Sequence, residues 1–318
     1  GVGTGLYFAN QNTSGKTISE KTSQKLDYIN KLIDAKFLNK VNESDLEDGI
    51  YKGLLEGLND PYSVYYTAEE YRKMMEQTSG TYSGIGALVS QNAETGIITV
   101  VKAFADAPAA KAGVKNGDIK GKEVTGVDIN NVVTEMKGEK GTTVDITVYR
   151  ESEKKYIDFT ITRDQVNEPT VEYKMLDKKK KIGYIQISQF EEVTYDQFTK
   201  ALDDLKKQGM KAVIFDVRSN PGGLYETVCK MLDEILPEGN LVSTKDKQTS
   251  DSKCLDMPMV VLQNKDSASA SEIFAGAIQD FNAGKIVGTQ SFGKGIVQTI
   301  LPLSDGSAVK LTVQDYYT

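Results

Sequence analysis

The sequence predicts an α/β protein in three parts: an N-terminal helical segment (residues 1–78), a strand-rich α+β module (79–164) and a core (165–318) on which part of residues 40–78 packs. Helical spacing of apolar residues dominates before residue 79, and β-branched apolar runs dominate the module that follows. After Val171 strands and helices alternate, a pattern typical of a mostly parallel sheet covered by helices.

The composition restricts the classes of function. With 318 residues, 39% of them hydrophobic and 26% charged, the chain is an ordinary globular protein. Its net charge of -7 argues against nucleic acid as the main partner, and the basic run Lys178–Lys181 is interpreted as a solvated turn. There is no histidine and no metal motif, so neither a metal nor another cofactor is expected. Cys229 and Cys254 could pair in an oxidising compartment, but two separate thiols are expected.

The N-terminal segment begins with the apolar stretch Gly1–Ala9, which is too short to span a bilayer and has no initiating Met. It is interpreted either as the start of a processed chain, whose upstream part was a membrane anchor or signal, or as an arbitrary boundary. Residues 18–75 follow as three helices, the third opened by a capping box at Thr67–Glu70. Helices this short need an apolar surface to rest on, either the main body or a second copy of themselves.

The module at 79–164 combines short strands with two helices. Strands are predicted over 85–89, 97–104 and 144–148. One short helix begins near Pro108 and ends at Gly113, and a second helix runs from 129 to 136 and ends at Gly138.

The core contains three predicted strand–helix units. Strands cover 182–187, 212–217 and 259–262, and helices follow Thr194, which is expected as a cap, then Leu224 and Ser269. Sites in such sheets lie at the carboxyl ends of the strands. Two polar or glycine-rich segments fall at that edge, 221–223 and 267–271.

Ser269 precedes a helix with one continuous apolar face (Ala270, Ile273, Phe274, Ala277, Ile278 and Phe281), so it lies at a helix N-terminus. It is either a plain cap or a nucleophile whose oxyanion is held by the Ala270 N–H. In a chain without histidine, a lysine amine is the natural base for a serine.

Lys294 lies between two glycines before a β-rich run, where Lys294, Ile296 and Gln298 face the same way on a strand. Desolvation lowers the pKa of such a lysine, although a glycine-flanked lysine is more commonly a surface residue. Gly222 and Gly223 form either a tight turn or an oxyanion hole with an unhindered N–H.

The module resembles a PDZ domain at Ser83-Gly84-Ile85-Gly86-Ala87, at residues 107–114 and at Gly117-Asp118-Ile119. The resemblance implies that the loop Gly84, Ile85, Gly86 and Ala87 captures a peptide C-terminus, which adds to the sheet edge as a strand. One departure is the shortness of the segment between Ile119 and Gly121.

The core and the entry segment Asp60-Pro61-Tyr62-Ser63 resemble carboxyl-terminal processing (tail-specific) proteases. The matching motifs are residues 218–224, 261–273 and 287–298, and the resemblance covers roughly residues 40–318. It implies a crotonase/ClpP-like core and a Ser-Lys-Gln site, in which Ser269 is the nucleophile, Lys294 follows 25 positions later and Gln298 is the third member. Gly222 and Ala270 are implied as oxyanion donors. Two departures are the short segment 245–254 and the end of the chain at Thr318.

The expectation is a serine endopeptidase that cuts extracytoplasmic proteins near their C-termini. Its PDZ domain would bind substrate tails and gate the site, and its N-terminal helices would form a homodimer. The resemblance places it in the bacterial cell envelope, membrane-anchored or secreted. The rival hypotheses are a PDZ peptide-binding scaffold with a resting or inactive site, and an α/β enzyme with a small acyl substrate.

Overall fold

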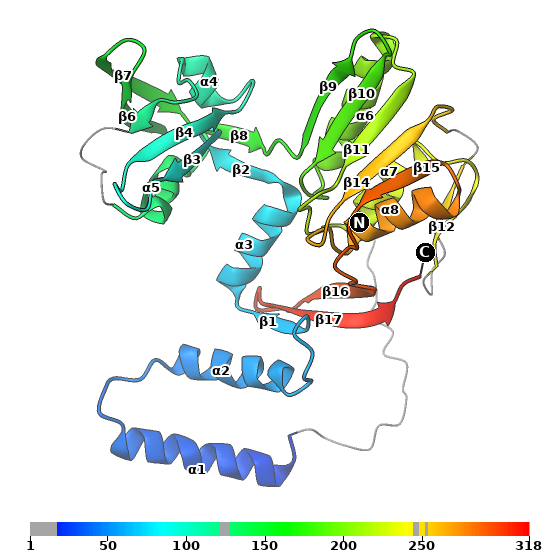
Figure 1. The fold of residues 1–318 in the computed structure, drawn as a ribbon. Coiled ribbons are helices and arrows are strands. Elements are labelled where there is room, and N and C mark those ends of the chain that lie inside the picture. The colour runs from blue at the N-terminus through cyan, green and yellow to red at the C-terminus, as the bar shows by residue number, and fades with distance from the viewer. Residues whose placement is uncertain (1–17, 121–126, 244–247, 252–253, 318) are drawn as a thin grey trace. The chain divides into compact units, whose positions relative to one another are not determined.

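The computed structural model describes residues 18–120, 127–243, 248–251 and 254–317 (Figure 1). The apolar stretch at 1–9, the short segment at 121–122, part of 245–254 and residue 318 lie outside these residues. The chain divides into two compact units, residues 1–54 and 55–318, and each is described by itself.

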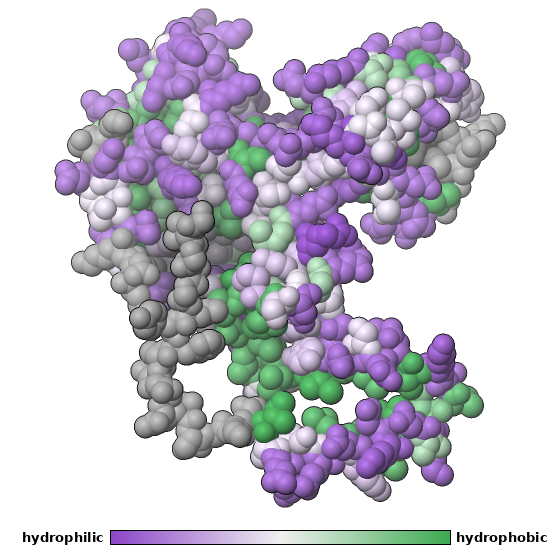
Figure 2. All heavy atoms as spheres, turned by 180° about the vertical axis from the view of Figure 1, so that it is seen from behind, coloured by the Kyte–Doolittle hydropathy of each residue, from purple (hydrophilic) through white to green (hydrophobic). Residues whose placement is uncertain are grey.

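The first unit contains helix α1 (Glu20–Lys36) and most of helix α2 (Glu43–Glu56). No side chain of α1 is buried, although the helix carries apolar residues at helical spacing. Tyr28, Ile29 and Leu32 are 62%, 42% and 43% exposed, and Figure 2 shows hydrophobic side chains at the surface of these helices. Helices of this length draw most of their stability from packing, and the apolar face of α1 is exposed.

The core of the second unit is the mostly parallel sheet that the sequence predicts, with strand order β15-β14-β11-β10-β9. Its strands are β9 (Val171–Asp177), β10 (Ile182–Ile187), β11 (Ala212–Asp216), β14 (Met259–Gln263) and β15 (Gly284–Gly288). β10, β11, β14 and β15 run parallel, and β9 is antiparallel to β10. The covering helices are α6 (Thr194–Lys207), α7 (Tyr225–Asp233) and α8 (Ala270–Asp280).

Aromatic packing fixes helix α8 on the sheet. Phe274 is fully buried, and its ring lies 5.4 Å from that of Phe215 and 6.4 Å from that of Phe198. Ile273, Phe274, Ala277 and Ile278 are all buried, which confirms the apolar face predicted for this helix. Because α8 begins directly after Ser269, this packing also fixes the place of the serine.

A second, antiparallel sheet has the order β1-β17-β16, formed by β1 (Val64–Tyr66), β17 (Ala308–Asp315) and β16 (Ile296–Pro302). The sequence did not reveal β1, because three residues are too few for a periodic pattern. The register between β16 and β17 shifts between Val297 and Gln298. β12 (Gly239–Val242) and β13 (Gln248–Ser250) form a separate antiparallel pair, and Ser243, just after β12, is bridged to Tyr317 after β17.

The α+β module contains a five-stranded antiparallel sheet, ordered β3-β4-β5-β6-β7, with helices α4 (Pro108–Ala112) and α5 (Ile129–Met136). Its strands are β3 (Ala87–Gln91), β4 (Ile98–Ala103), β5 (Ile119–Lys120), β6 (Thr143–Arg150) and β7 (Lys155–Thr162). The strand predicted over 85–89 instead begins at Ala87, after Gly86, whose φ of +75° suits glycine. A buried ion pair of Arg150 with Asp118, 2.7 Å long, ties β6 to the turn before β5.

Two segments connect this module to the core: β2 (Thr81–Gly84), which follows helix α3 (Ala68–Ser79), and β8 (Asp164–Asn167), which pairs with β2. The Glu168 N–H donates to the Gly80 carbonyl at 2.7 Å, next to the side chain of Glu191. Glu191 is 5% exposed, and its Oε2 has no hydrogen-bond partner among the described residues. Burial, and secondarily the charge of Glu168, raise the pKa of Glu191 to about 7.

Four local expectations have clear outcomes. The capping box at Thr67 and Glu70 opens α3 as predicted, and Lys178–Lys181 is an exposed turn. Cys229 and Cys254 are free thiols. The expectation that Thr194 caps α6 was wrong, because Thr194 is the first helical residue and its hydroxyl accepts the Glu191 N–H at 2.9 Å.

The buried Glu191 predicts a specific dependence of stability on pH. Its pKa is about 7 in the folded chain against 4.5 for an unperturbed glutamate, so the folded state binds the extra proton and stability falls as pH rises through this interval. Glu191→Gln removes this loss, and we expect it to gain at most about 3 kcal/mol at pH 8 and little at pH 4. Thermal unfolding at both pH values measures it, with the exposed neighbour Glu192→Gln as control. An equal effect of Glu191→Gln at both pH values contradicts the prediction.

Candidate functional site

Two loops meet at the carboxyl edge of the parallel sheet, because β11 and β14 are paired neighbours in it. Residues 217–224 follow β11 and residues 264–269 follow β14. The Ser267 hydroxyl donates to the Val217 carbonyl at 2.8 Å, and the Ser271 hydroxyl donates to the Asn220 carbonyl at 2.9 Å. Both flanking serines are buried and bind the loops together, which leaves Ser269 as the serine of the three that lines a cavity.

Asn220 organises the first loop, and the sequence analysis did not single it out. It is fully buried; its amide donates to the Ile187 carbonyl at 2.9 Å and its Oδ1 accepts the Gly222 N–H at 2.8 Å. Its carbonyl also accepts the Ala268 N–H at 3.0 Å. The available signal was its position in a strand–Asn–Pro–Gly–Gly turn, where asparagine side chains bond nearby backbone.

Ser269 lies between the second loop and α8 with φ +55° and ψ −116°. A positive φ is uncommon for a residue with a side chain and stores strain, which is found preferentially at functional sites. The opposite loop approaches closely: a Cβ on Gly222 would lie 2.8 Å from the Ser269 Cβ. Glycine is therefore required at 222 for the two loops to meet.

The backbone N–H groups near Ser269 differ in whether they already have a hydrogen-bond acceptor. Ala270 is the first residue of α8, where helical N–H groups have no acceptor within the helix. The Gly222 N–H, which the resemblance implies as an oxyanion donor, donates to Asn220 inside its own turn. Gly223, one residue on, lines the cavity beside Ser269 and Ala270.

The segment that carries Lys294 is attached to the start of α8 by Glu272. The Glu272 Oε2 accepts the Lys294 N–H at 2.9 Å and the Ser269 N–H at 2.7 Å. The structure therefore brings the backbones of Ser269 and Lys294 to one carboxylate. Sequence reasoning placed Lys294 near Ser269 only through the resemblance and did not identify Glu272.

The Lys294 side chain points to an aromatic ring. Its Nζ lies 4.4 Å from the centre of the Tyr62 ring, and no hydrogen bond joins it to the Ser269 hydroxyl, both residues being within the described structure. Burial and then the positive charge of Lys310 lower the pKa of Lys294, whereas the charge of Asp60 opposes this. A ring face also favours the ammonium form of a lysine.

Tyr62 belongs to a turn that is fixed on the second sheet. The Ser63 hydroxyl donates to Asp60 at 2.6 Å and accepts the Thr312 N–H of β17 at 3.0 Å. The entry segment singled out in the sequence thus supplies the ring that contacts Lys294. This contact links residues that lie far apart in the sequence.

Gln298, the third residue of the implied site, lines the cavity with Ser269. Its Nε2 is buried without a hydrogen-bond partner in the described part of the chain, so it does not hold the Lys294 amine here. The regular alternation from Lys294 to Gln298 assumed in the sequence analysis is interrupted by the register shift at Val297 and Gln298.

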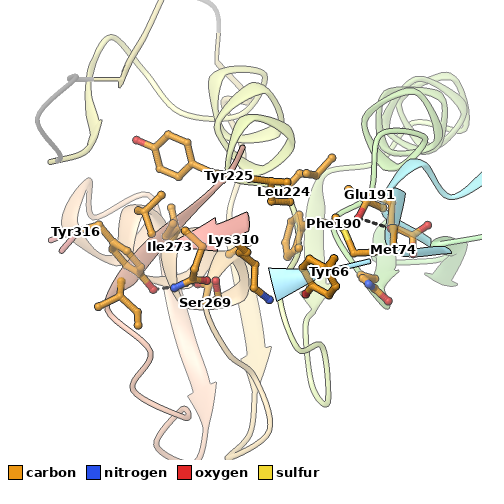
Figure 3. Close-up of a pocket in the computed structure, with 18 residues that line it drawn as sticks. Tyr66, Met74, Phe190, Glu191, Leu224, Tyr225, Ser269, Ile273, Lys310 and Tyr316 are labelled. Atoms are coloured by element: carbon orange, nitrogen blue, oxygen red, sulfur yellow. Dashed lines mark hydrogen bonds between the residues drawn. The ribbon is translucent and has the colours of Figure 1, made fainter. Parts of the chain in front are cut away.

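A cavity of about 300 Å³ opens beside Ser269 (Figure 3). Figure 3 shows Ser269 and Tyr316 at one end and Met74 and Glu191 at the other. Its wall is largely apolar, with Phe190, Leu224 and Ile273 among its members, and Lys310 contributes a cation. Such a space suits an apolar side chain held next to the serine. The described residues include no cluster of three or more acidic or cysteine side chains able to hold a metal ion.

The four residues of the predicted peptide-binding loop lie where β2 passes into β3. Gly84 ends β2, Ala87 begins β3, and Ile85 is 2% exposed between them. The Ile85 and Gly86 carbonyls accept the N–H groups of Ala109 and Phe104 at 2.7 and 3.0 Å. β3 is an edge strand of its sheet, so one side of it is open to another strand.

The sequence is similar to known protein families and to individual curated proteins. Residues 181–318 match the family model for peptidase family S41, and residues 6–70 match that for the N-terminal domain of the activating protease CtpB. A probable CtpA-like serine protease of Staphylococcus epidermidis is 37% identical over 93% of this chain and 62% of the relative. A carboxy-terminal-processing protease of Bartonella bacilliformis is 38% identical over 87% of this chain and 66% of the relative. The chain thus spans less than two thirds of the length of these curated relatives.

Among solved structures, the photosystem II D1 C-terminal processing protease is similar over 94% of this chain and 82% of its own, with 26% identity and a TM-score of 0.51. A putative S41 protease from Bacteroides fragilis NCTC 9343 shares the fold, with a TM-score of 0.56 at 16% identity over 84% of this chain and 78% of its own. Among the described helices, none combines the length and hydropathy that crossing a membrane requires. From its motifs, its fold and these relatives, the chain belongs to peptidase family S41, among the carboxyl-terminal processing proteases.

Proposed function

We propose that the chain is a serine endopeptidase in which Ser269 is the nucleophile and Lys294 is the base. The observation that carries the proposal is the placement of both residues on one carboxylate, next to a cavity that a substrate side chain can fill. The strained backbone of Ser269 at the start of α8 supports it, because a plain cap residue has φ/ψ in the ordinary β region.

In the proposed acylation step, the neutral Lys294 amine accepts the hydroxyl proton of Ser269 while the Ser269 Oγ attacks the substrate carbonyl carbon. The tetrahedral oxyanion rests on the Ala270 N–H and on the backbone of the Gly222–Gly223 turn. The Lys294 ammonium then gives its proton to the leaving amine, which breaks the peptide bond and leaves an acyl-enzyme. Water releases the acyl group, with Lys294 again acting as base.

The lowering of the pKa of Lys294 by burial serves this role, since a base must hold a share of neutral amine at the working pH. The Tyr62 ring acts in the opposite sense because it favours the ammonium. Lys294 must leave this ring to reach Ser269. The arrangement on Tyr62 supports a resting state of the site and is the observation that favours the rival hypothesis, a peptide-binding scaffold with an inactive site.

The proposed substrates are protein tails. We assign the loop Gly84–Ala87 and the open edge of β3 to binding a peptide C-terminus as an added strand. The cavity beside Ser269 would take an apolar side chain near the cleaved bond. Gln298, whose amide is buried without a partner, would bind the lysine amine or the substrate once the site assembles.

The proposed setting follows the resemblance to tail-specific proteases: a cell-envelope enzyme, membrane-anchored or secreted, that acts as a homodimer through its N-terminal helices. The exposed apolar face of α1 supports the dimer, because it would become buried between two copies.

The catalytic assignment predicts that Ser269→Ala and Lys294→Ala each reduce cleavage of an unstructured protein at least about a thousandfold. The control is Lys285→Ala, an exposed lysine of β15, which keeps wild-type activity. The measurement is the initial rate of release of defined fragments. Equal cleavage by the wild type and both site variants refutes the proposal.

The contact between Lys294 and Tyr62 predicts a shift of the pH profile. Tyr62→Leu removes the ring that favours the ammonium, so the pKa of Lys294 falls and the acid limb of kcat/KM moves about 0.5–1.5 pH units lower. Tyr62→Phe keeps the ring face and the wild-type limb. Tyr156→Leu, at an exposed tyrosine of β7, is the matched control. If the acid limb of kcat/KM does not move in Tyr62→Leu, the ring does not affect the pKa of Lys294 and the prediction is wrong.

The dimer proposal predicts that Ile29→Glu with Leu32→Glu yields a monomer, because charges replace the apolar face of α1. Lys31→Glu, on the same helix, keeps the wild-type mass. Light scattering coupled to size exclusion measures both. A dimer that persists in the double variant places the contact elsewhere.

A further inference from the structure

One carboxylate and one hydroxyl contact the backbone of both residues of the proposed pair. The Glu272 Oε2 accepts the N–H groups of Ser269 and Lys294 at 2.7 and 2.9 Å, and its Oε1 accepts the Gly293 N–H at 2.6 Å. The Tyr316 hydroxyl lies within hydrogen-bond distance of two backbone carbonyl oxygens. It donates to the carbonyl of Ser269 at 3.2 Å and to the carbonyl of Lys294. The segments around Ser269 and Lys294 are therefore linked twice: their backbone N–H groups bind Glu272, and their backbone carbonyl groups bind Tyr316.

Ordinary helix capping explains only one of these contacts. A glutamate at the third position of a helix commonly accepts the N–H of the cap residue, here Ser269. It has no reason to accept the N–H groups of Gly293 and Lys294, which follow it by 21 and 22 residues. Tyr316, from the end of β17, has no part in capping at all.

The chemistry of Glu272 and Tyr316 suits them to hold the backbones around Ser269 and Lys294 together. Three N–H groups converge on Glu272, and an ionised carboxylate offers acceptors only, so each finds a lone pair. Burial, and then the charge of Glu272, raise the pKa of the Tyr316 hydroxyl, which keeps it protonated as a donor. Tyr316 is 8% exposed, so water does not compete for the two carbonyl oxygens.

We propose that Glu272 and Tyr316 are positioning residues that hold the backbones of Ser269 and Lys294 in a fixed register, so that the base reaches the nucleophile by rotation of its side chain alone. The inference rests on the proposed function for the roles of Ser269 and Lys294. Neither Glu272 nor Tyr316 touches the reacting atoms. Their effect is on the geometry of attack, where a displacement of about 1 Å costs on the order of a hundredfold in rate.

The test compares Glu272→Gln and Tyr316→Phe with matched controls. Glutamine keeps one acceptor and places an NH₂ group against the N–H groups that the other oxygen accepted, and phenylalanine deletes the shared hydroxyl. Glu226→Gln makes the same change in the first turn of α7 at an exposed residue, and Tyr317→Phe makes the other change at the exposed neighbour of Tyr316.

Kinetics separate positioning from binding and folding. We expect kcat to fall about 10- to 100-fold in Glu272→Gln and about tenfold in Tyr316→Phe, with KM within about twofold and thermal unfolding close to the wild type. The rate of Ser269 modification by a fluorophosphonate should fall in parallel. The double variant should lose less than the product of the single losses, because both residues fix the same register. Losses that multiply, or that track unfolding, overturn the proposal.

Amide hydrogen exchange measures how firmly the segment of Gly293 and Lys294 is held, and this measurement does not depend on activity. In the Ser269→Ala background, Glu272→Gln should speed exchange of the Gly293 and Lys294 amides, and Glu226→Gln should not. Unchanged exchange overturns the inference, as does faster exchange together with unchanged kcat. Wild-type cleavage by Ser269→Ala would instead refute the proposed function, and the exchange result would still report whether Glu272 holds the two segments together.

Discussion

The site depends on one topological constraint, the parallel pairing of β11 with β14. This pairing ends both strands at the same edge, so that the loops after them must share the space above it. The buried Asn220 then decides how they share it, because its carbonyl accepts groups from the second loop while its side chain binds the first. The close approach of Gly222 to Ser269 follows from these bonds. Loosening them would separate the serine from the turn that faces it, even with the side chains of Ser269 and Lys294 intact.

Electrostatics in the site are balanced without histidine. Burial and Lys310 favour the neutral amine of Lys294, while Asp60 and the Tyr62 ring favour the ammonium. A lysine base needs both influences. An amine held fully neutral would be a poor acid for the leaving group, and one held fully charged would be no base. The entry segment and β17 thus supply opposing contributions from two sides of the same amine.

Much of the fold could be predicted from the sequence, because its helices and strands show apolar residues at regular local spacing. The apolar face of α8 and the strands around it follow from spacing alone, and the resemblance to carboxyl-terminal processing proteases was recognised from three motifs. The strand β1 was missed because three residues carry no period. Glu272 and Asn220 were missed because their partners lie far away in sequence or in their own backbone turn, and no periodic pattern records such contacts. The assignment of Gly222 as a donor came from resemblance alone, which carries no information on the bond its N–H makes to Asn220.

The contact of Lys294 with Tyr62 has a consequence for the speed of any control over the site. If Glu272 and Tyr316 hold both backbones in register as proposed, the resting and assembled forms would differ in the torsions of one side chain. Rotation of one side chain is faster than the ordering of a loop. A peptide tail arriving at the enzyme would then need only to change the relative populations of two lysine rotamers. Regulation of this kind is graded and rapidly reversible, and activity would cease as soon as the tail dissociates.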